Sequence, residues 1–188
     1  MPRRGRPRPS TCPQQSTGLY AAPYLDSAVF ISWIKGDEFE DDGTDRADVA
    51  EHILLLAERG DYKVYISSLT LAEVYKPKGY DPLNPTQNQR FLDYVENEFF
   101  EMVIVDRDIG LEANRIAAMH GLNPNDAIHT ACALRADCDV ILTWDKPFLN
   151  KTVPGIRIER PQKLGQLFLP EDTTGEQPTA SQDADDGN

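Results

Sequence analysis

Four carboxylates are the residues of this chain best placed to do chemistry. Each stands where an apolar strand is expected to give way to a helix, or lies in the first turns of a helix. They are Asp26, Glu73, Asp126 and Asp145. Acids at the carboxyl ends of parallel strands converge on one crevice at that edge of the sheet. Because like charges so close together are costly unless a divalent cation neutralises them, the four positions predict hard-metal chemistry.

Each acid also has an interpretation that involves no metal. Asp26 is well placed to cap a helix, because Asp is among the best N-cap residues. Glu73 lies beside an apolar helix face, where a glutamate is usually solvated. The macrodipole favours Asp126 in the first turn of its helix, and Asp145 is typical of a turn. The joint placement of all four near strand ends favours the metal interpretation over four separate structural roles.

Polar residues near the four acids supply further candidates. Ser27 and Thr143 can hydrogen-bond a ligand or a metal-bound water, or serve only as a cap and a turn residue. His129 follows Asp126 by three residues and so lies on nearly the same helix face, where it can approach the site or a phosphate. A partly buried packing histidine is the favoured interpretation, because metal-held water needs no histidine base. Three basic residues can contact phosphate, although on an acidic domain a solvated role is expected for each. They are Arg115, Arg135 and Lys146.

Apolar segments with the spacing of strands alternate along the chain with segments of helical periodicity. We expect strands at residues 22–26, 62–66, 102–105, 139–143 and 156–158. Expected helices lie at residues 27–35, 44–58, 67–76, 87–100, 109–120, 124–136 and 162–168. Thr44 is the predicted N-cap of one helix, and Asn123 with Pro124 begins another. The alternation predicts an α/β fold with a mostly parallel sheet covered by helices on both faces.

Composition divides the chain into three parts. Residues 1–18 form a basic arm rich in Pro and Arg that we expect to be flexible, and residues 171–188 form an acidic tail whose composition is typical of disorder. The remaining residues, 19–170, have room for one domain with an ordinary core. Of the net charge of −12, the arm accounts for +4 and the tail for −6, which leaves −10 on the predicted domain. The broad basic surface typical of nucleic-acid binding is therefore not expected there.

Hydropathy and cysteine content bear on location. No apolar run approaches the ~20 residues that span a bilayer, and no apolar stretch follows the N-terminal arginines as a secretory signal requires. A soluble protein without a membrane partner is expected. The three cysteines, an odd number without metal-ligand spacing, favour a reducing cytoplasm. A disulfide between Cys132 and Cys138 stays open as a less favoured alternative.

Four short segments carry a resemblance to a known family. They read YLDSAVFI (24–31), SSLTLAEV (67–74), NDAIHTACAL (125–134) and ILTWDKPF (141–148), and each contains one of the four acids. Over residues 24–148 the chain resembles PIN domains, particularly the VapC-type toxins of bacterial toxin–antitoxin pairs. The resemblance implies a PIN-like three-layer α/β/α sandwich. It also implies an endoribonuclease, dependent on Mg²⁺ or Mn²⁺, that cleaves single-stranded or looped RNA.

The resemblance assigns roles to residues and partners as well. The four acids match the family's acids position by position, which implies that all four are catalytic and hold one or two metal ions. A homodimer is implied, and so is an antitoxin protein whose C-terminal segment crosses the active-site groove. Two features depart from the family pattern: Trp144 stands where a small polar residue is common, and residues 37–43 form an unusually acidic loop. These departures bear on substrate access and leave the metal site intact.

Two other classes of protein stay open on the sequence. A small metal-dependent phosphatase generally has a second Asp two residues after its nucleophilic Asp, but the residue two positions after Asp26 is Ala28. A PIN-like module without catalytic activity uses the same fold to bind a partner, and the presence of all four acids argues against it. RNA cleavage, phosphate-ester turnover and RNA binding alone distinguish the three classes.

Overall fold

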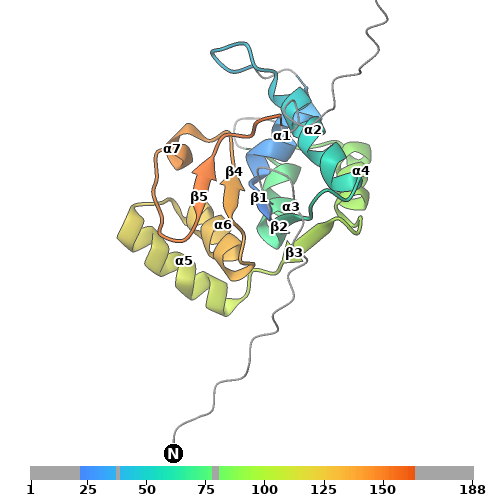
Figure 1. The fold of residues 1–188 in the computed structure, drawn as a ribbon. Coiled ribbons are helices and arrows are strands. Elements are labelled where there is room, and N and C mark those ends of the chain that lie inside the picture. The colour runs from blue at the N-terminus through green and yellow to red at the C-terminus, as the bar shows by residue number, and fades with distance from the viewer. Residues whose placement is uncertain (1–21, 37–38, 78–80, 164–188) are drawn as a thin grey trace, which may run out of the picture.

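The computed structural model describes residues 22–36, 39–77 and 81–163 (Figure 1). The predicted basic arm, residues 1–18, and the predicted acidic tail, residues 171–188, lie outside the described residues. None of the helices in the described part of the chain is both long enough and apolar enough to cross a membrane.

A parallel sheet lies at the centre of the structure (Figure 1). Its strands are β1 (Pro23–Leu25), β2 (Val64–Ser67), β3 (Phe100–Val103), β4 (Val140–Leu142) and β5 (Arg157–Glu159). They run in the order β3-β2-β1-β4-β5, and every pair of neighbours is parallel. The first strand of the described chain is therefore the middle strand of the sheet, between β2 and β4. The prediction of a mostly parallel sheet is confirmed.

Helices cover both faces of the sheet (Figure 1). They are α1 (Ser27–Lys35), α2 (Arg46–Glu58), α3 (Ser68–Tyr75), α4 (Pro85–Val95), α5 (Arg107–His120), α6 (Pro124–Arg135) and α7 (Lys146–Leu149). One buried cluster packs the first four helices against one face, and a second packs α5, α6 and α7 against the other. This is the predicted three-layer α/β/α sandwich.

Alternation along the central strands explains why both faces are apolar. In β1, Leu25 belongs to the cluster under α1, whereas Tyr24 belongs to the cluster under α6. In β4, Val140 and Leu142 face the first cluster and Ile141 faces the second. Side chains on a strand point to opposite faces in turn, so a strand covered on both faces reads as a continuous apolar run.

Several helix boundaries differ from the predicted ones because of local hydrogen bonds. Asp45, and not Thr44, is the N-cap of α2, because its side chain accepts from the backbone N–H groups of Ala47 and Asp48. The helix predicted at residues 87–100 begins at Pro85, after a capping box formed by Asn84 and Gln87.

The same region ends earlier than predicted. Helix α4 stops at Val95, and a turn follows in which the side chain of Asn97 donates to the carbonyl of Tyr94 over 2.7 Å. The backbone N–H of Phe100 then donates to the carbonyl of Asn97, and Phe100 begins β3 with a buried ring. The strand predicted at residues 102–105 is therefore two residues too late.

In the C-terminal part of the chain, the structure contains one helix that was not predicted, and it describes only two residues of another helix that was predicted. Helix α7 has only four residues and was not predicted. Of the closing helix predicted at residues 162–168, residues 162 and 163 have no regular structure, and the rest lie outside the described residues. Cys132 and Cys138 are buried free thiols, and burial raises the pKa of each to about 12.

Removing a core side chain tests the layered packing. Ile141 is completely buried in the middle of β4, so we expect Ile141→Ala to lower the free energy of unfolding by about 2–5 kcal/mol through lost burial and a residual cavity. The matched control is Ile104→Ala, because the side chain of Ile104 is 62% exposed and its truncation is expected to change stability by about 0.5 kcal/mol or less. Urea unfolding of both variants measures the difference, and equal losses would contradict this placement of Ile141.

Candidate metal centre

The strand order reverses between β1 and β4, because the chain runs outward through β2 and β3 and then returns to the other side of β1. In open parallel sheets, ligands bind at the carboxyl ends of the strands beside such a reversal. Asp26 follows β1 directly and Thr143 follows β4 directly. The backbone N–H of Asp26 donates to the carbonyl of Leu142 over 3.1 Å, so the two strand ends stay paired up to this point.

Asp26 is the central acid of this edge. Its residue is 6% exposed, and both carboxylate oxygens already have donors. Oδ2 accepts from the hydroxyl of Thr143 at 2.6 Å, and Oδ1 accepts from the backbone N–H of Ser27 at 2.8 Å. Asp26 is thus the N-cap of α1, as one interpretation of the sequence predicted, and it also points its carboxylate into the crevice. Thr143 and Ser27 hold that carboxylate in one orientation.

Glu73 reaches the same place from α3. Its Oε2 lies 2.8 Å from Nε2 of His129, and its Oε1 accepts from the side chain of Asn125 at 2.6 Å. Burial alone would raise the pKa of Glu73. The hydrogen bond and positive charge of His129 act in the opposite direction, together with hydrogen bonds from Ser27 and Asn125, so that the pKa lies below its usual value. A lowered pKa keeps this carboxylate charged at neutral pH.

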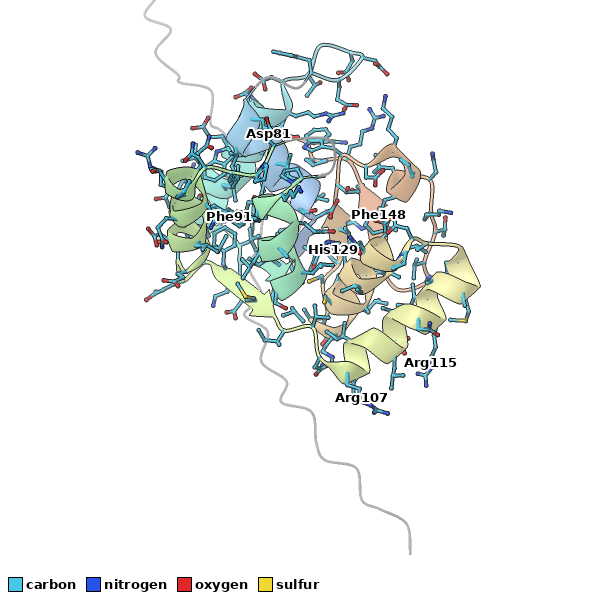
Figure 2. The ribbon with its side chains drawn as sticks, turned by 180° about the vertical axis from the view of Figure 1, so that it is seen from behind. Asp81, Phe91, Arg107, Arg115, His129 and Phe148 are labelled. Carbon is cyan, nitrogen blue, oxygen red and sulfur yellow. The ribbon has the colours of Figure 1, made fainter. Side chains whose placement is uncertain are left out.

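His129 approaches the site, which was the less favoured of the two sequence interpretations. It is 1% exposed and lies between α3 and α6 in the interior (Figure 2). Nε2 lies 2.8 Å from Oε2 of Glu73 and 3.3 Å from Oδ1 of Asp26, while Nδ1 lies 2.8 Å from the hydroxyl of Tyr24. Burial would lower the pKa of His129, but the hydrogen bond to Glu73 and the nearby acids raise it. His129 is therefore not the partly buried packing residue that we expected.

Asp126 occupies the first turn of α6. Its backbone N–H donates to Oδ1 of Asn123 over 2.9 Å, and the Asn123 side chain in turn donates to Oδ2 of Asp126 over 2.7 Å. Burial and the charges of Asp26 and Asp145 raise the pKa of Asp126 to about 6, against the opposing effects of Asn123 and His129. The raised pKa means that the nearby negative charge disfavours ionisation of this carboxyl.

Asp145 is the fourth acid and the N-cap residue of α7. It is half-buried, and its backbone N–H donates to the hydroxyl of Thr143 over 3.0 Å. Thr143 thus links Asp145 to Asp26 through one oxygen atom. The structure brings all four predicted acids to one edge of the sheet, where Asp126 senses both Asp26 and Asp145.

The tightest group of donor atoms differs from the four-acid prediction. Asp26, Glu73 and His129 each offer one atom such that all three atoms lie within 4.8 Å of one another. Asp126 and Asp145 are neighbours of this group but do not belong to it. The helical spacing of three residues between Asp126 and His129 was the available signal for the histidine.

These donors fit a divalent cation. Carboxylate oxygens are the ligands that hard cations prefer, and one imidazole nitrogen is added here. Three acids that repel one another at a partly water-excluded edge are stabilised when a cation enters. The residues present are therefore compatible with the predicted Mg²⁺ or Mn²⁺.

Arg46 connects Trp144 with the acidic loop. The ring of Trp144 is buried directly before Asp145, and the guanidinium of Arg46 lies over it at 5.4 Å from the ring centre. Arg46 pairs with Glu40 of the loop, with Nε 2.6 Å from Oε1, and Arg160 pairs with the other oxygen of Glu40 at 2.9 Å. Two arginines therefore hold Glu40 of the loop, and one of them, Arg46, lies over the indole.

The three basic residues singled out in the sequence each contact a surface acid. Arg115 contacts Glu112, Arg135 contacts Asp106 and Lys146 contacts Asp41. This agrees with the solvated roles expected for them.

Replacing Asp126 by Asn tests the crowding of charge. The pKa of this carboxyl is about 6 in the folded protein and roughly 3.9 in an unfolded chain, so its ionisation weakens folding progressively from about pH 4 to about pH 6 and fully above that. We expect Asp126→Asn to raise the Tm of the metal-free protein by about 2–4 °C at about pH 7.5, for a penalty of about 1 kcal/mol. The gain should shrink as the pH falls and vanish below about pH 4, where the carboxyl is protonated in both the folded and the unfolded protein.

Thermal unfolding followed by circular dichroism in EDTA measures this difference. Asp61→Asn is the control, because its side chain is 46% exposed and its ion pair with Arg59 is long, at 3.9 Å. A Tm for Asp126→Asn that is unchanged or lowered at the higher pH would contradict the crowding.

Known proteins place this fold. The PIN domain family matches residues 24–153. A toxin–antitoxin complex from Klebsiella pneumoniae contains a similar chain, with a TM-score of 0.53 and 20% identity over 75% of this chain and 98% of that one. VapBC2 from Rickettsia felis, solved with a DNA fragment from its promoter, gives a TM-score of 0.49 and 19% identity over 74% and 98%. None of the curated proteins compared with this chain matches it. Because the match extends over more than half of its length, the chain belongs to the PIN domain family.

Proposed function

We propose that this PIN domain is a metal-dependent endoribonuclease that hydrolyses RNA phosphodiester bonds, and that it is the toxin of a toxin–antitoxin pair. The observation that carries the proposal is the meeting of four acids at the carboxyl edge of β1 and β4, with Asp26 at their centre. Folding alone does not require this arrangement, because burial together with the charges of Asp26 and Asp145 disfavours ionisation of Asp126 and raises its pKa to about 6. A cluster that opposes folding is typical of a functional site.

In this proposal Asp26, Asp126 and Asp145 hold Mg²⁺ or Mn²⁺, and Glu73 completes the ligand set or orients a water. When bound, the ion lowers the pKa of a water molecule, polarises the scissile phosphodiester and neutralises developing charge. Both oxygens of Asp26 keep capacity for a ligand, since a carboxylate oxygen accepts more than one contact. Thr143 and Ser27 fix the direction in which Asp26 presents that capacity.

The charge of the domain bears on how RNA is bound. Residues 19–170 carry −10, so general attraction to phosphate is weak, and the three basic side chains discussed above already contact surface acids. Binding in this proposal depends on the metal centre and on an unpaired stretch of RNA that can enter the crevice. A single-stranded or looped substrate fits this requirement better than a duplex.

The partners belong to the proposal too. The fold shared with a chain of the Klebsiella pneumoniae toxin–antitoxin complex supports an antitoxin that covers the acidic crevice. A basic side chain of such a partner can neutralise the acids in place of a cation. A homodimer and a cytoplasmic location complete the proposed setting.

Purified full-length protein, free of any antitoxin, tests the proposed activity on total RNA with Mg²⁺ or Mn²⁺. We expect cleavage that EDTA abolishes and that Asp26→Asn lowers by about a hundredfold or more, because metal chemistry supplies several kcal/mol. Asp61→Asn, an exposed acid on the surface, is the matched control and should keep full activity. Mapping the products should give 5′-phosphate and 3′-hydroxyl ends.

Other outcomes would support a different function or a different mechanism. RNA that is bound but stays intact at every metal concentration would favour a PIN-like binding module. Intact RNA together with turnover of p-nitrophenyl phosphate would favour a phosphatase. Cleavage that survives EDTA or Asp26→Asn would remove the acids from the mechanism.

A further inference from the structure

We infer that Nε2 of His129 is a ligand of the metal centre, and that this nitrogen makes the centre prefer a transition-metal dication over Mg²⁺. The inference rests on the proposed function for the existence of a metal centre at these acids. It adds to the proposed centre a ligand that is not one of the four acids, and it names the class of ion that the centre prefers.

The positions of the donor atoms carry the first step. Nε2 of His129 lies 2.8 Å from Oε2 of Glu73 and 3.3 Å from Oδ1 of Asp26. Two ligands at right angles on an ion with bonds of about 2.1 Å lie about 3.0 Å apart. The two distances lie on either side of this value. Nε2 therefore already occupies a position beside two carboxylate oxygens that one ion can share.

The other ring nitrogen carries the second step. Nδ1 lies 2.8 Å from the hydroxyl of Tyr24, a fully buried residue of β1. The two rings meet edge to face, with centroids 5.7 Å apart. Histidine ligands of metals almost always have the second nitrogen held by a hydrogen bond, which fixes both the ring and the tautomer. Because the Tyr24 hydroxyl can accept from Nδ1–H, the ring can keep that proton while an incoming ion displaces the proton between Nε2 and Glu73 and binds the Nε2 lone pair.

Burial separates this role from that of a packing residue. His129 is 1% exposed on a helix whose buried residues include the apolar Ala127 and Ala131 as well as the polar Asp126 and Thr130. Packing at such a position needs only an apolar side chain. Here both ring nitrogens have polar partners, and the partners of Nε2 are the two acids that the sequence had assigned to the metal.

The kind of ligand determines the kind of ion. Mg²⁺ prefers oxygen ligands and keeps several waters, whereas imidazole is a common ligand of first-row transition metals. A centre that includes one imidazole should bind Mn²⁺ more tightly than Mg²⁺. Removing the imidazole should reduce that preference and leave an oxygen-only centre.

Mn²⁺ alone is the probe, added to full-length protein that has been freed of metal. Pulsed electron paramagnetic resonance detects a ¹⁴N nucleus that is coordinated to Mn²⁺, and titration calorimetry gives the affinities for Mn²⁺ and Mg²⁺. We expect the wild-type protein to give a ¹⁴N signal that His129→Gln abolishes. Tyr24→Phe should weaken Mn²⁺ binding by about tenfold or more, because it removes the partner of Nδ1. His129→Gln should weaken Mn²⁺ binding more than Mg²⁺ binding.

The other histidines are the matched controls. The sequence has three, so His52→Gln and His120→Gln should both keep the ¹⁴N signal. Retention in both assigns the nitrogen to His129 even if His129→Gln fails to fold.

Failure of this inference is distinct from failure of the proposed function. Mn²⁺ that binds, depends on Asp26 and gives no ¹⁴N signal would overturn the histidine ligand and leave the acidic centre in place. A protein that binds no Mn²⁺ at all would overturn both. Equal losses of Mn²⁺ and Mg²⁺ affinity in His129→Gln would overturn the proposed selectivity.

Discussion

Repulsion among carboxylates at the edge of β1 and β4 is the constraint on which the rest of the site depends. Asp26, Asp126 and Asp145 approach closely enough that the charges of the other two raise the pKa of Asp126. The fold tolerates this because donors from adjacent turns oppose it. Thr143 donates to Asp26, and Asn123 donates to Asp126. Asp26 and Asp126 thus each accept a hydrogen bond from a residue in a turn that lies beside them in space.

The same constraint explains why Glu73 depends on the opposite helix layer. It lies on α3, which packs with the first core cluster, whereas its partners Asn125 and His129 lie on α6, which packs with the second. The hydrogen bonds that Asn125 and His129 donate to Glu73 therefore cross the carboxyl edge of the sheet and join the two layers. Charge and hydrogen bonding join the two helix layers at this edge, whereas apolar packing joins each layer to its face of the sheet.

Much of this arrangement could be predicted from sequence because it follows from strand ends. Asp26 and Asp145 stand just beyond β1 and β4, and parallel strands bring such positions to one edge whatever the details of packing. Helix starts marked by a strong cap, such as Asn123 before Pro124, were also predictable. In the first case the position at a strand end is sufficient, and in the second the determining contacts lie within a few residues along the chain.

What could not be predicted depends on contacts between distant segments. His129 and Tyr24 are separated by 105 residues, and their hydrogen bond requires the exact seating of α6 on β1. The end of α4 depends on burial of Phe100 against rings of other elements, such as Phe30. Local patterns carry no information about such choices.

The loop over Trp144 shows how a departure from the family pattern is accommodated. Glu40 has a side chain that is only 3% exposed, and it contacts Arg46 and Arg160, which come from opposite ends of the described chain. A buried carboxylate is tolerated only when it is paired, and here it has two cations. Glu40 of the acidic loop is therefore paired with the arginine that lies over the indole.

The place of β1 in the middle of the sheet has a consequence for the newly made chain. Asp26 is synthesised early, but its hydrogen-bond partner Thr143 follows 117 residues later. Until the ribosome has released the segment that becomes β4, one side of β1 has no neighbour, and Asp26 has neither Thr143 nor Asp145 beside it. A nascent chain therefore has an incomplete acidic centre for most of its synthesis. The order of the strands delays assembly of the centre until most of the domain is available to fold around it.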